Sequence, residues 1–195
     1  MVAPQDSTRI RGGQSFRQAD GRSIVDMSRA VTITIARLKT SAGPMLAAFT
    51  GRGLAALERG DDMASFGEGL SRRYPGAALS NAPASQLADE LDEYLAGKRR
   101  TFNVPVDLED LAAFNRRALL AARDIPYGET MTYGDLATVV GHPGAARAVG
   151  NALSRSPISI VVPCHRVVRA ADGLGGWGGN VSEKRRLLAL EREHR

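Results

Sequence analysis

The sequence predicts a mixed α/β protein of the α+β kind, with an antiparallel sheet in its N-terminal part and a mainly helical C-terminal part. Three observations support this fold class. Residues 31–58 contain three short apolar runs separated by Gly-containing turns, which is typical of an antiparallel meander. Residues 107–123 and 182–194 carry apolar side chains at helical spacing. A single cysteine in 195 residues excludes a disulfide-stapled scaffold.

The composition excludes several other classes of protein. Hydrophobic residues make up 43% of the chain and charged residues 24%, as in an ordinary soluble domain. No segment approaches the ~20 apolar residues of a membrane span, and the first thirty residues lack the apolar stretch of a signal peptide. We therefore expect a cytoplasmic protein with no membrane partner. The cysteine and the three histidines lack the spacing of a zinc site, so we expect no metal.

The N-terminal half divides into a tail and a domain. Residues 1–28 are polar, rich in Gly, Arg and Gln, and without periodicity, which predicts a disordered tail. Residues 29–103 form the predicted N-terminal domain. It holds strands in the runs VTITIARL, MLAAFT and LAALE, and helices over 62–74 and 84–97. The run TFNVPV at 101–106 is predicted to be a short strand that leads to the second domain.

The second predicted domain covers residues 104–195 and begins with helices. Asp107 is expected to cap a helix that runs to about Arg123. After a turn with the sequence IPYG, Thr132 and Asp135 have the spacing of a capping box. This signal predicts that a second, shorter helix starts directly after Thr132.

A helix-turn-helix is predicted from the next signals. The short helix stops at Gly141, and Pro143 suits the first turn of a following helix, GAARAVGNALSR. Two short helices around a Gly-containing turn, the second one basic, fit this motif, although many helical hairpins share the spacing. Residues 141–195 contain nine basic and four acidic side chains, and the rest of the chain has no net charge. This asymmetry indicates a polyanionic partner; a solubilising surface bias is the alternative.

The single cysteine, Cys164, is the candidate nucleophile. An apolar, strand-like run, PISIVVP, leads to it, and His165 and Arg166 follow directly. Nearby cations favour the thiolate, which is the reactive form of the side chain. The alternative is that Cys164 is a small buried hydrophobic residue, the commoner case for a lone cysteine. Its neighbours make the reactive interpretation the stronger one.

His165 needs a group that orients its ring if it acts as a base. Neighbouring side chains on an extended chain point to opposite faces, so a direct bond from Cys164 to His165 requires a backbone turn or a bridging water. On the final helix, Glu191 falls on the apolar side beside Leu187. A buried carboxylate requires a partner, and His165 is the candidate. The alternative is an exposed Glu191 near the helix end.

The segment around the cysteine resembles a known family. The run PCHRV at 163–167 is similar to the active-site signature of the O6-alkylguanine-DNA alkyltransferases, also called methylated-DNA–protein-cysteine methyltransferases. Further runs match this family at 125–129, 133–137, 145–150, 174–176 and 184–191. The resemblance is strong over residues 107–195. Residues 31–100 resemble the family's less distinctive N-terminal domain, which implies an RNase H-like sheet.

The resemblance implies a single-use DNA repair protein. Cys164 would take the alkyl group from O6 of guanine, and less readily from O4 of thymine, and keep it as a thioether. His165 would deprotonate Cys164 through a bound water, and Glu191 would orient His165. Tyr133 would donate its hydroxyl proton toward the guanine ring and help to turn the nucleotide.

The implied partner is double-stranded DNA that contains O6-alkylguanine. The damaged base must leave the stack to reach a buried thiol. In the family, the second helix of the helix-turn-helix enters the minor groove, where Arg147 would fill the gap left by the base. Ala145, Ala146 and Gly150 are small enough for the helix to approach the groove closely; tight packing between helices is the alternative reason for their size. We expect a monomer and leave cooperative binding on DNA open.

The resemblance also implies a base pocket, and two of its positions depart from the family. The backbone carbonyls of Cys164 and Val167 would accept from the base amino group, and the amide of Gly178 would bond to O6. Ser156 replaces the usual Asn, which weakens the bracing of the hinge. Trp177 replaces the usual Tyr, and its indole would stack on the base or narrow the pocket. The family's zinc ligands are absent, and we expect no cofactor.

Two alternatives come from other functional classes. A lesion sensor without chemistry would lack the cysteine, whereas this chain keeps Cys164, His165 and Glu191. A Cys–His hydrolase would leave the helix of Arg147 unexplained. The number of turnovers per molecule separates the three functions: one for an alkyl acceptor, none for a sensor and many for a hydrolase.

Overall fold

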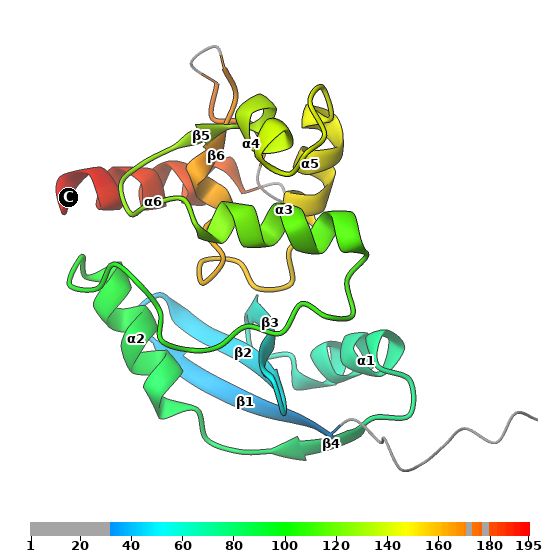
Figure 1. Cartoon of the computed structure of the whole chain (residues 1–195). Coiled ribbons are helices and arrows are strands. Elements are labelled where there is room, and N and C mark those ends of the chain that lie inside the picture. Colours follow the sequence, from blue (N-terminus) through cyan, green and yellow to red (C-terminus); the bar gives the residue numbers. More distant parts are fainter. Residues whose placement is uncertain (1–31, 171–172, 177–179) are drawn as a thin grey trace, which may run out of the picture.

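The computed structural model describes residues 32–170, 173–176 and 180–195. The predicted tail, residues 1–28, lies outside this part of the chain. Figure 1 shows a sheet with two flanking helices at one end of the molecule and a cluster of helices at the other. We call residues 32–95 the sheet part and residues 113–195 the helical part. No helix of the described residues is long and apolar enough to cross a membrane.

The sheet part confirms the predicted meander and adds a fourth strand. Its strands are β1 (Thr32–Thr40), β2 (Gly43–Thr50), β3 (Gly53–Arg59) and β4 (Ala78–Asn81). The first three pair antiparallel, and β4 pairs parallel to β1, which gives the order β3-β2-β1-β4. The sequence does not predict β4, because this strand of four exposed residues, ALSN, is too short to show an alternating pattern.

Both faces of the sheet are covered. The helices are α1 (Met63–Arg73) and α2 (Ser85–Leu95), as predicted. One face, with Ile33 and Ile35, packs against Phe66 and Leu70 of α1. The other face belongs to a larger core that includes α2 and the helical part. The alternate residues of β1 therefore contact different neighbours, and α2 lies in the same core as the helical part.

The connection between the two parts differs from the prediction. Residues 101–106 form no regular strand, and only a single bridge joins Val106 to Leu54. Asp107 does not cap a helix. Its buried carboxylate accepts from Thr50 Oγ1 at 2.5 Å and pairs with Arg52 at 3.0 Å, so contacts with the β2–β3 turn outweigh the local capping signal.

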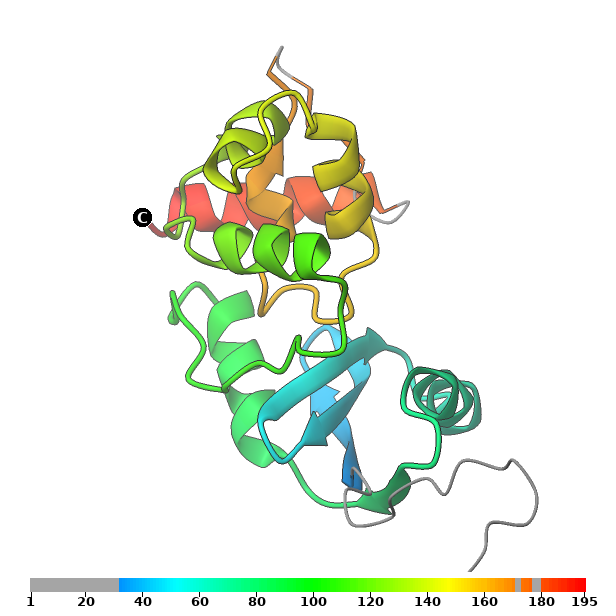
Figure 2. The same ribbon diagram turned by 45° about the vertical axis from the view of Figure 1, so that its right-hand side comes forward.

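The helix after this connection, α3 (Ala113–Arg123), begins five residues later than a cap at Asp107 predicted and ends where expected. Figures 1 and 2 show α3 lying across the helical part on the side that faces the sheet. Its buried residues are Ala118, Leu119 and Ala122. Two of these, Leu119 and Ala122, belong to the larger core. The two helices that follow therefore pack against α3.

The predicted helix-turn-helix is present. Strand β5 (Met131–Thr132) leads into α4 (Tyr133–Val139), and α5 (Ala146–Ser154) follows. Thr132 Oγ1 accepts from the amide of Asp135 at 3.1 Å, which confirms Thr132 as the cap of α4. The prediction that Pro143 lies in the first turn of the second helix is wrong. Gly144 has a positive φ of 85°, so the chain becomes helical only from Ala146.

The cysteine lies in a tight turn instead of at the end of a strand. The run before it forms only isolated bridges, one of them to the sheet, where Leu57 N donates to Pro157 O at 2.7 Å. Cys164–Arg166 form a 3₁₀ turn, and β6 (Val167–Val168) pairs parallel to β5. The last helix is α6 (Val181–Glu193). Ile160, with a φ of 78°, breaks the predicted strand.

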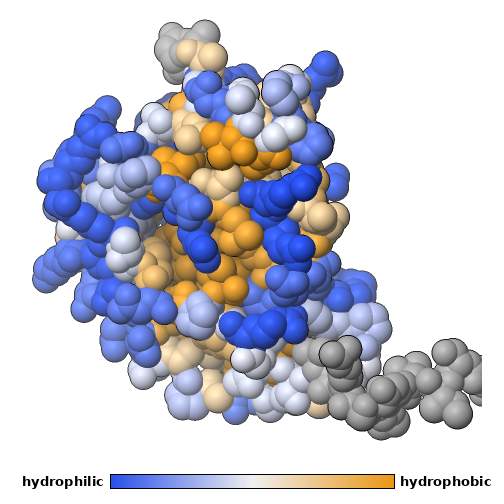
Figure 3. All heavy atoms as spheres, viewed as in Figure 1, coloured by the Kyte–Doolittle hydropathy of each residue, from blue (hydrophilic) through white to orange (hydrophobic). Residues whose placement is uncertain are grey.

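The outer surface shows where the two parts meet. Figure 3 shows apolar side chains gathered along the middle of this face, with hydrophilic side chains on both sides of them. This agrees with the continuous core that joins α2 and one face of the sheet to the helical part. Residues of both parts therefore contribute to one hydrophobic core.

Candidate active site

Cys164 is buried at the start of the 3₁₀ turn, with 1% of its surface exposed. Burial raises the pKa of its thiol to about 12, although a hydrogen bond with the Ser156 side chain and the charge of Lys184 lower it. The expectation that a nearby cation favours the thiolate holds for Lys184, but burial of the thiol has the larger effect. Burial penalises the thiolate more than one buried ammonium stabilises it, so the resting side chain is a neutral thiol.

His165 and Glu191 form the predicted pair. His165 Nε2 and Glu191 Oε1 are 2.9 Å apart, and both side chains are completely buried. The alternative of an exposed Glu191 is thereby excluded. Burial lowers the pKa of His165, and the charges of Arg166 and Lys184 lower it further against the opposing effect of Glu191. The structure favours a neutral imidazole, which can accept a proton.

Arg166 contacts Glu191 and not the thiol. Its Nη2 donates to Glu191 Oε1 at 2.9 Å, its Nε to Oε2 at 3.0 Å, and its Nη1 to the carbonyl of Ile125 at 2.6 Å. Burial pushes the pKa of Glu191 upward, but hydrogen bonds from His165 and Arg166 outweigh burial and hold it at about 2. Sequence analysis missed this role, because adjacency to Cys164 suggested that Arg166 served the thiol.

Lys184 is a second buried cation that the sequence analysis did not single out. Its Nζ donates to the carbonyl of Val167 at 2.5 Å and lies 3.5 Å from the hydroxyl of Tyr133. Burial lowers the pKa of Lys184 to about 8. The signal for it in the sequence was a lysine at helical spacing from Leu187 and Glu191, on the apolar side of the last helix.

Tyr133 lies between this lysine and the loop that follows β6. Its hydroxyl donates to the carbonyl of Gly176 at 3.0 Å. Gly175 has a φ of 70°, and a Cβ there would come within 2.8 Å of the Tyr133 ring. Only glycine allows the loop to lie this close to the tyrosine.

An open cavity of about 670 Å³ lies against the helix-turn-helix. It brings together Tyr133, Ala146, Arg147 and Gly150 from the predicted set, and it adds Arg169, which the sequence analysis counted only as charge. Ala145, one of the predicted small residues, is partly buried against the core. Close packing is therefore the reason for its small size.

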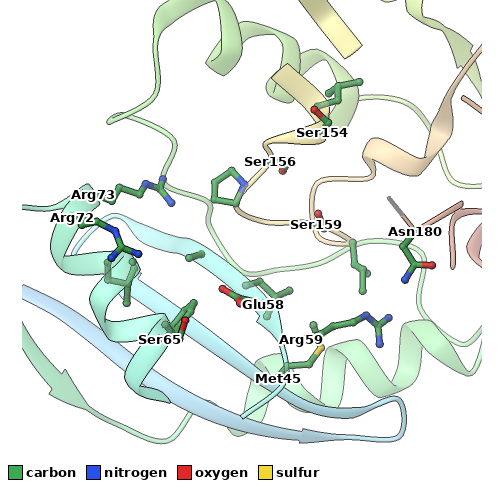
Figure 4. A pocket seen from close by; sticks show the side chains of 18 residues that line it. Met45, Glu58, Arg59, Ser65, Arg72, Arg73, Ser154, Ser156, Ser159 and Asn180 are labelled. Carbon is green, nitrogen blue, oxygen red and sulfur yellow. The ribbon is translucent and has the colours of Figure 1, made fainter. Parts of the chain in front are cut away.

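Ser156 contacts Cys164 but does not line the cavity at the helix-turn-helix. Ser156 lines a separate cavity of about 530 Å³ between β3, α1 and the segment before Cys164, and its Oγ accepts from Ile158 N at 3.3 Å. Figure 4 shows Ser156 at the upper side of this cavity, Arg59 at its lower side and Arg73 at the left. Trp177 and Gly178 lie outside the described residues. Within the described ranges, no three His, Cys, Asp or Glu side chains are arranged to hold a metal ion.

The fold and the site define a class of protein: a helix-turn-helix protein with one buried cysteine beside a buried His–Glu pair. Comparison with known families agrees. A family model described as "6-O-methylguanine DNA methyltransferase, DNA binding domain" matches residues 113–193, and "6-O-methylguanine DNA methyltransferase, ribonuclease-like domain" matches residues 33–108. The chain belongs to the 6-O-methylguanine DNA methyltransferase family.

Individual relatives support this membership. A methylated-DNA–protein-cysteine methyltransferase of Mycolicibacterium paratuberculosis is 50% identical over 106 residues, which are 54% of this chain and 64% of that protein. The match thus spans less than two thirds of this relative. An inducible methyltransferase with the same name from Bacillus subtilis is 39% identical over 64% of this chain and 70% of its own length.

The solved structures confirm the predicted fold class. Mycobacterium tuberculosis OGT in complex with DNA is 36% identical to this chain, with a TM-score of 0.69. The similarity covers 83% of this chain and 94% of that one. The sheet and the helices are therefore shared over nearly the whole described chain.

Proposed function

We propose that this protein repairs DNA by transferring the alkyl group from O6 of guanine to Cys164, once per molecule. The observation that carries the proposal is the buried thiol that directly precedes a neutral His165 hydrogen-bonded to Glu191. Relatives named methylated-DNA–protein-cysteine methyltransferase support the reaction. O4-alkylthymine is the expected weaker substrate.

The proposed reaction balances as a displacement at carbon. The bond from Cys164 Sγ to the alkyl carbon forms while the bond from that carbon to O6 breaks. Because the pKa of the thiol is about 12, its proton leaves only as the substrate reacts, and His165 accepts it, through a water as the family resemblance implies. The released guanine takes a proton from the Tyr133 hydroxyl, and exchange with solvent then returns a proton to Tyr133 and removes the one on His165. The net result is an unmodified guanine and a stable thioether, which ends the reaction after one turnover.

The proposed partner is duplex DNA bound by α5. Arg147 and Arg169 line the cavity beside Tyr133, where a phosphate backbone and an extruded nucleotide would find cationic side chains. The small residues Ala146 and Gly150 leave the α5 backbone accessible at the same cavity. The DNA complex of the Mycobacterium tuberculosis relative supports this partner. A cytoplasmic location, at the nucleoid in a prokaryote, belongs to the same proposal.

Intact-protein mass spectrometry tests the proposed function. After incubation with a duplex that contains one O6-methylguanine, we expect one added methyl group per protein, mapped to Cys164 by peptide analysis. The number of lesions repaired should equal the number of protein molecules. Repair of many lesions per molecule would identify a hydrolase, and binding without methylation would identify a sensor.

Replacing Arg147 with alanine should separate DNA handling from chemistry. We expect at least about a tenfold slower repair of duplex DNA, in line with the ~1–3 kcal/mol of one arginine contact. Reaction with O6-benzylguanine as a free base should be unchanged, because it needs no base extrusion. Arg72→Ala is the matched control, since Arg72 is an exposed arginine on α1. Equal losses on both substrates would contradict the role of Arg147.

A further inference from the structure

The buried cluster around Glu191 contains one group from the sheet part. Tyr94, near the end of α2, is completely buried, and its hydroxyl donates to Glu191 Oε1 at 2.5 Å. The same hydroxyl lies 3.2 Å from His165 Nε2. Figures 1 and 2 show this end of α2 directed toward the helical part. A side chain from the sheet part thus completes the surroundings of a histidine in the helical part.

Three residues donate to Glu191 Oε1. Tyr94 Oη, His165 Nε2 and Arg166 Nη2 all lie within 2.9 Å of it, while the amide of Gly128 donates to Oε2. Burial and the charge of Glu191 raise the pKa of Tyr94, so its hydroxyl remains a donor. Each additional donor withdraws negative charge from the carboxylate and weakens its attraction for a proton on the imidazole.

We propose that Tyr94 is a positioning residue for alkyl transfer, whose hydroxyl shares Glu191 Oε1 with His165, holds the ring in place and keeps the imidazole neutral. The inference rests on the proposed function, since it concerns the base that accepts the thiol proton. It gives α2 a part in positioning the histidine of the helical part. The sheet part then acts on the reaction through this hydrogen bond as well as by packing.

The other charged and titratable groups around His165 and Glu191 remain in place when this hydroxyl is removed. They are Cys164 and Arg166 on the 3₁₀ turn, Lys184 on α6, and Tyr127 in the turn before β5. Arg166 and Lys184 favour the neutral imidazole by their charge. A change in the titration of His165 on replacing Tyr94 with phenylalanine therefore reports the lost hydroxyl.

Tyr127 supplies a matched control. Its ring packs edge-on against that of Tyr94, with the ring centres 6.0 Å apart. Its hydroxyl is buried and has no hydrogen-bond partner within the described part of the chain. Tyr127→Phe removes a buried hydroxyl from the same aromatic pair without removing a donor from Glu191.

The test uses the full chain and two readouts. The pKa of His165 is measured by NMR of its imidazole, and the rate of Cys164 alkylation by O6-benzylguanine is measured against pH. In Tyr94→Phe we expect the pKa of His165 to rise, the rate profile to move to higher pH, and the rate near neutrality to fall several-fold. Tyr127→Phe should reproduce both wild-type curves. Unchanged curves in Tyr94→Phe, or equal shifts in both variants, would overturn the inference.

A second variant keeps the test decisive if phenylalanine perturbs packing. 3-Fluorotyrosine at position 94 retains the hydroxyl and makes it a more acidic donor, so the pKa of His165 should fall; a rise or no change would overturn the role of Tyr94. The NMR readout does not depend on alkyl transfer. A wild-type protein that never alkylates Cys164 would refute the proposed function, whereas normal transfer with an unresponsive His165 would refute only this inference.

Discussion

Replacing Cys164 with alanine is expected to abolish alkyl transfer while leaving affinity for a lesion-containing duplex within a few-fold of the wild type. The chain has no other cysteine, so no second thiol can accept the alkyl group. The side chain is 1% exposed and contacts no DNA in the proposed arrangement except through the extruded base. Removing its sulfur should lower the free energy of unfolding by only about 1 kcal/mol, as for other small buried groups.

Two measurements check this expectation. Methyl transfer from labelled duplex DNA reports the chemistry, and fluorescence anisotropy with the same duplex reports binding. Cys164→Ser is the matched control, because it keeps a polar atom of similar position but has a far weaker nucleophile; it should bind DNA and transfer nothing. Residual transfer by Cys164→Ala would show that another atom accepts the alkyl group.

Replacing Glu191 with glutamine is expected to lower the free energy of unfolding by about 3–5 kcal/mol, the usual cost of breaking a buried ion pair. Glutamine keeps the shape of the side chain, but Arg166 loses its counter-charge while its own side chain is only 7% exposed. Alkyl transfer should fall strongly as well, because His165 loses its orienting carboxylate. Urea unfolding measures the stability. The control is Glu193→Gln, an exposed change on the same helix, which should leave stability within about 0.5 kcal/mol.

The stability of the wild type and that of Glu191→Gln should differ over a defined range of acid pH. The pKa of Glu191 is held at about 2 in the fold, against about 4.3 in an unfolded chain. Its contribution is therefore present above about pH 4.3 and is lost as the pH falls through 2. In Glu191→Gln this part of the acid limb should be flatter. Superimposable acid limbs would contradict the buried pairing.

His165 adds to the acid sensitivity in the same direction. Its pKa is lowered in the fold, so the neutral ring contributes stability above its unfolded value of about 6.5, and this is lost as the pH falls. Tyr94→Phe should weaken this loss, since it lets the folded protein hold a proton on His165 more readily.

Local patterns in the sequence predicted much of the fold. Alternation in β1 predicted a strand, and Thr132 with Asp135 predicted the start of α4 to the residue. The helical position of Glu191 predicted a buried carboxylate in need of a partner, and the contact with His165 is present. These predictions succeeded because each depends on residues within one turn or one strand of each other.

The predictions that were wrong concern residues whose partners are distant in the sequence. Asp107 is a good helix cap locally, but Thr50 and Arg52 of a distant turn bind its carboxylate. Arg166 follows the cysteine in sequence, yet its guanidinium lies on Glu191, 25 residues further along the chain. In both cases a partner that only folding brings close competes successfully with the local one.

The sequence by itself determined the family, the two structural classes within the chain, the single candidate nucleophile and the charge of its C-terminal segment. Only the tertiary structure decided the protonation state of that nucleophile and the membership of the cluster that serves it. The pKa of Cys164, the burial of Lys184 and the reach of Tyr94 from α2 depend on how much water and which charges remain near a group after packing. Desolvation and Coulomb interactions are set by distances in space, and neighbours in sequence specify few of these distances.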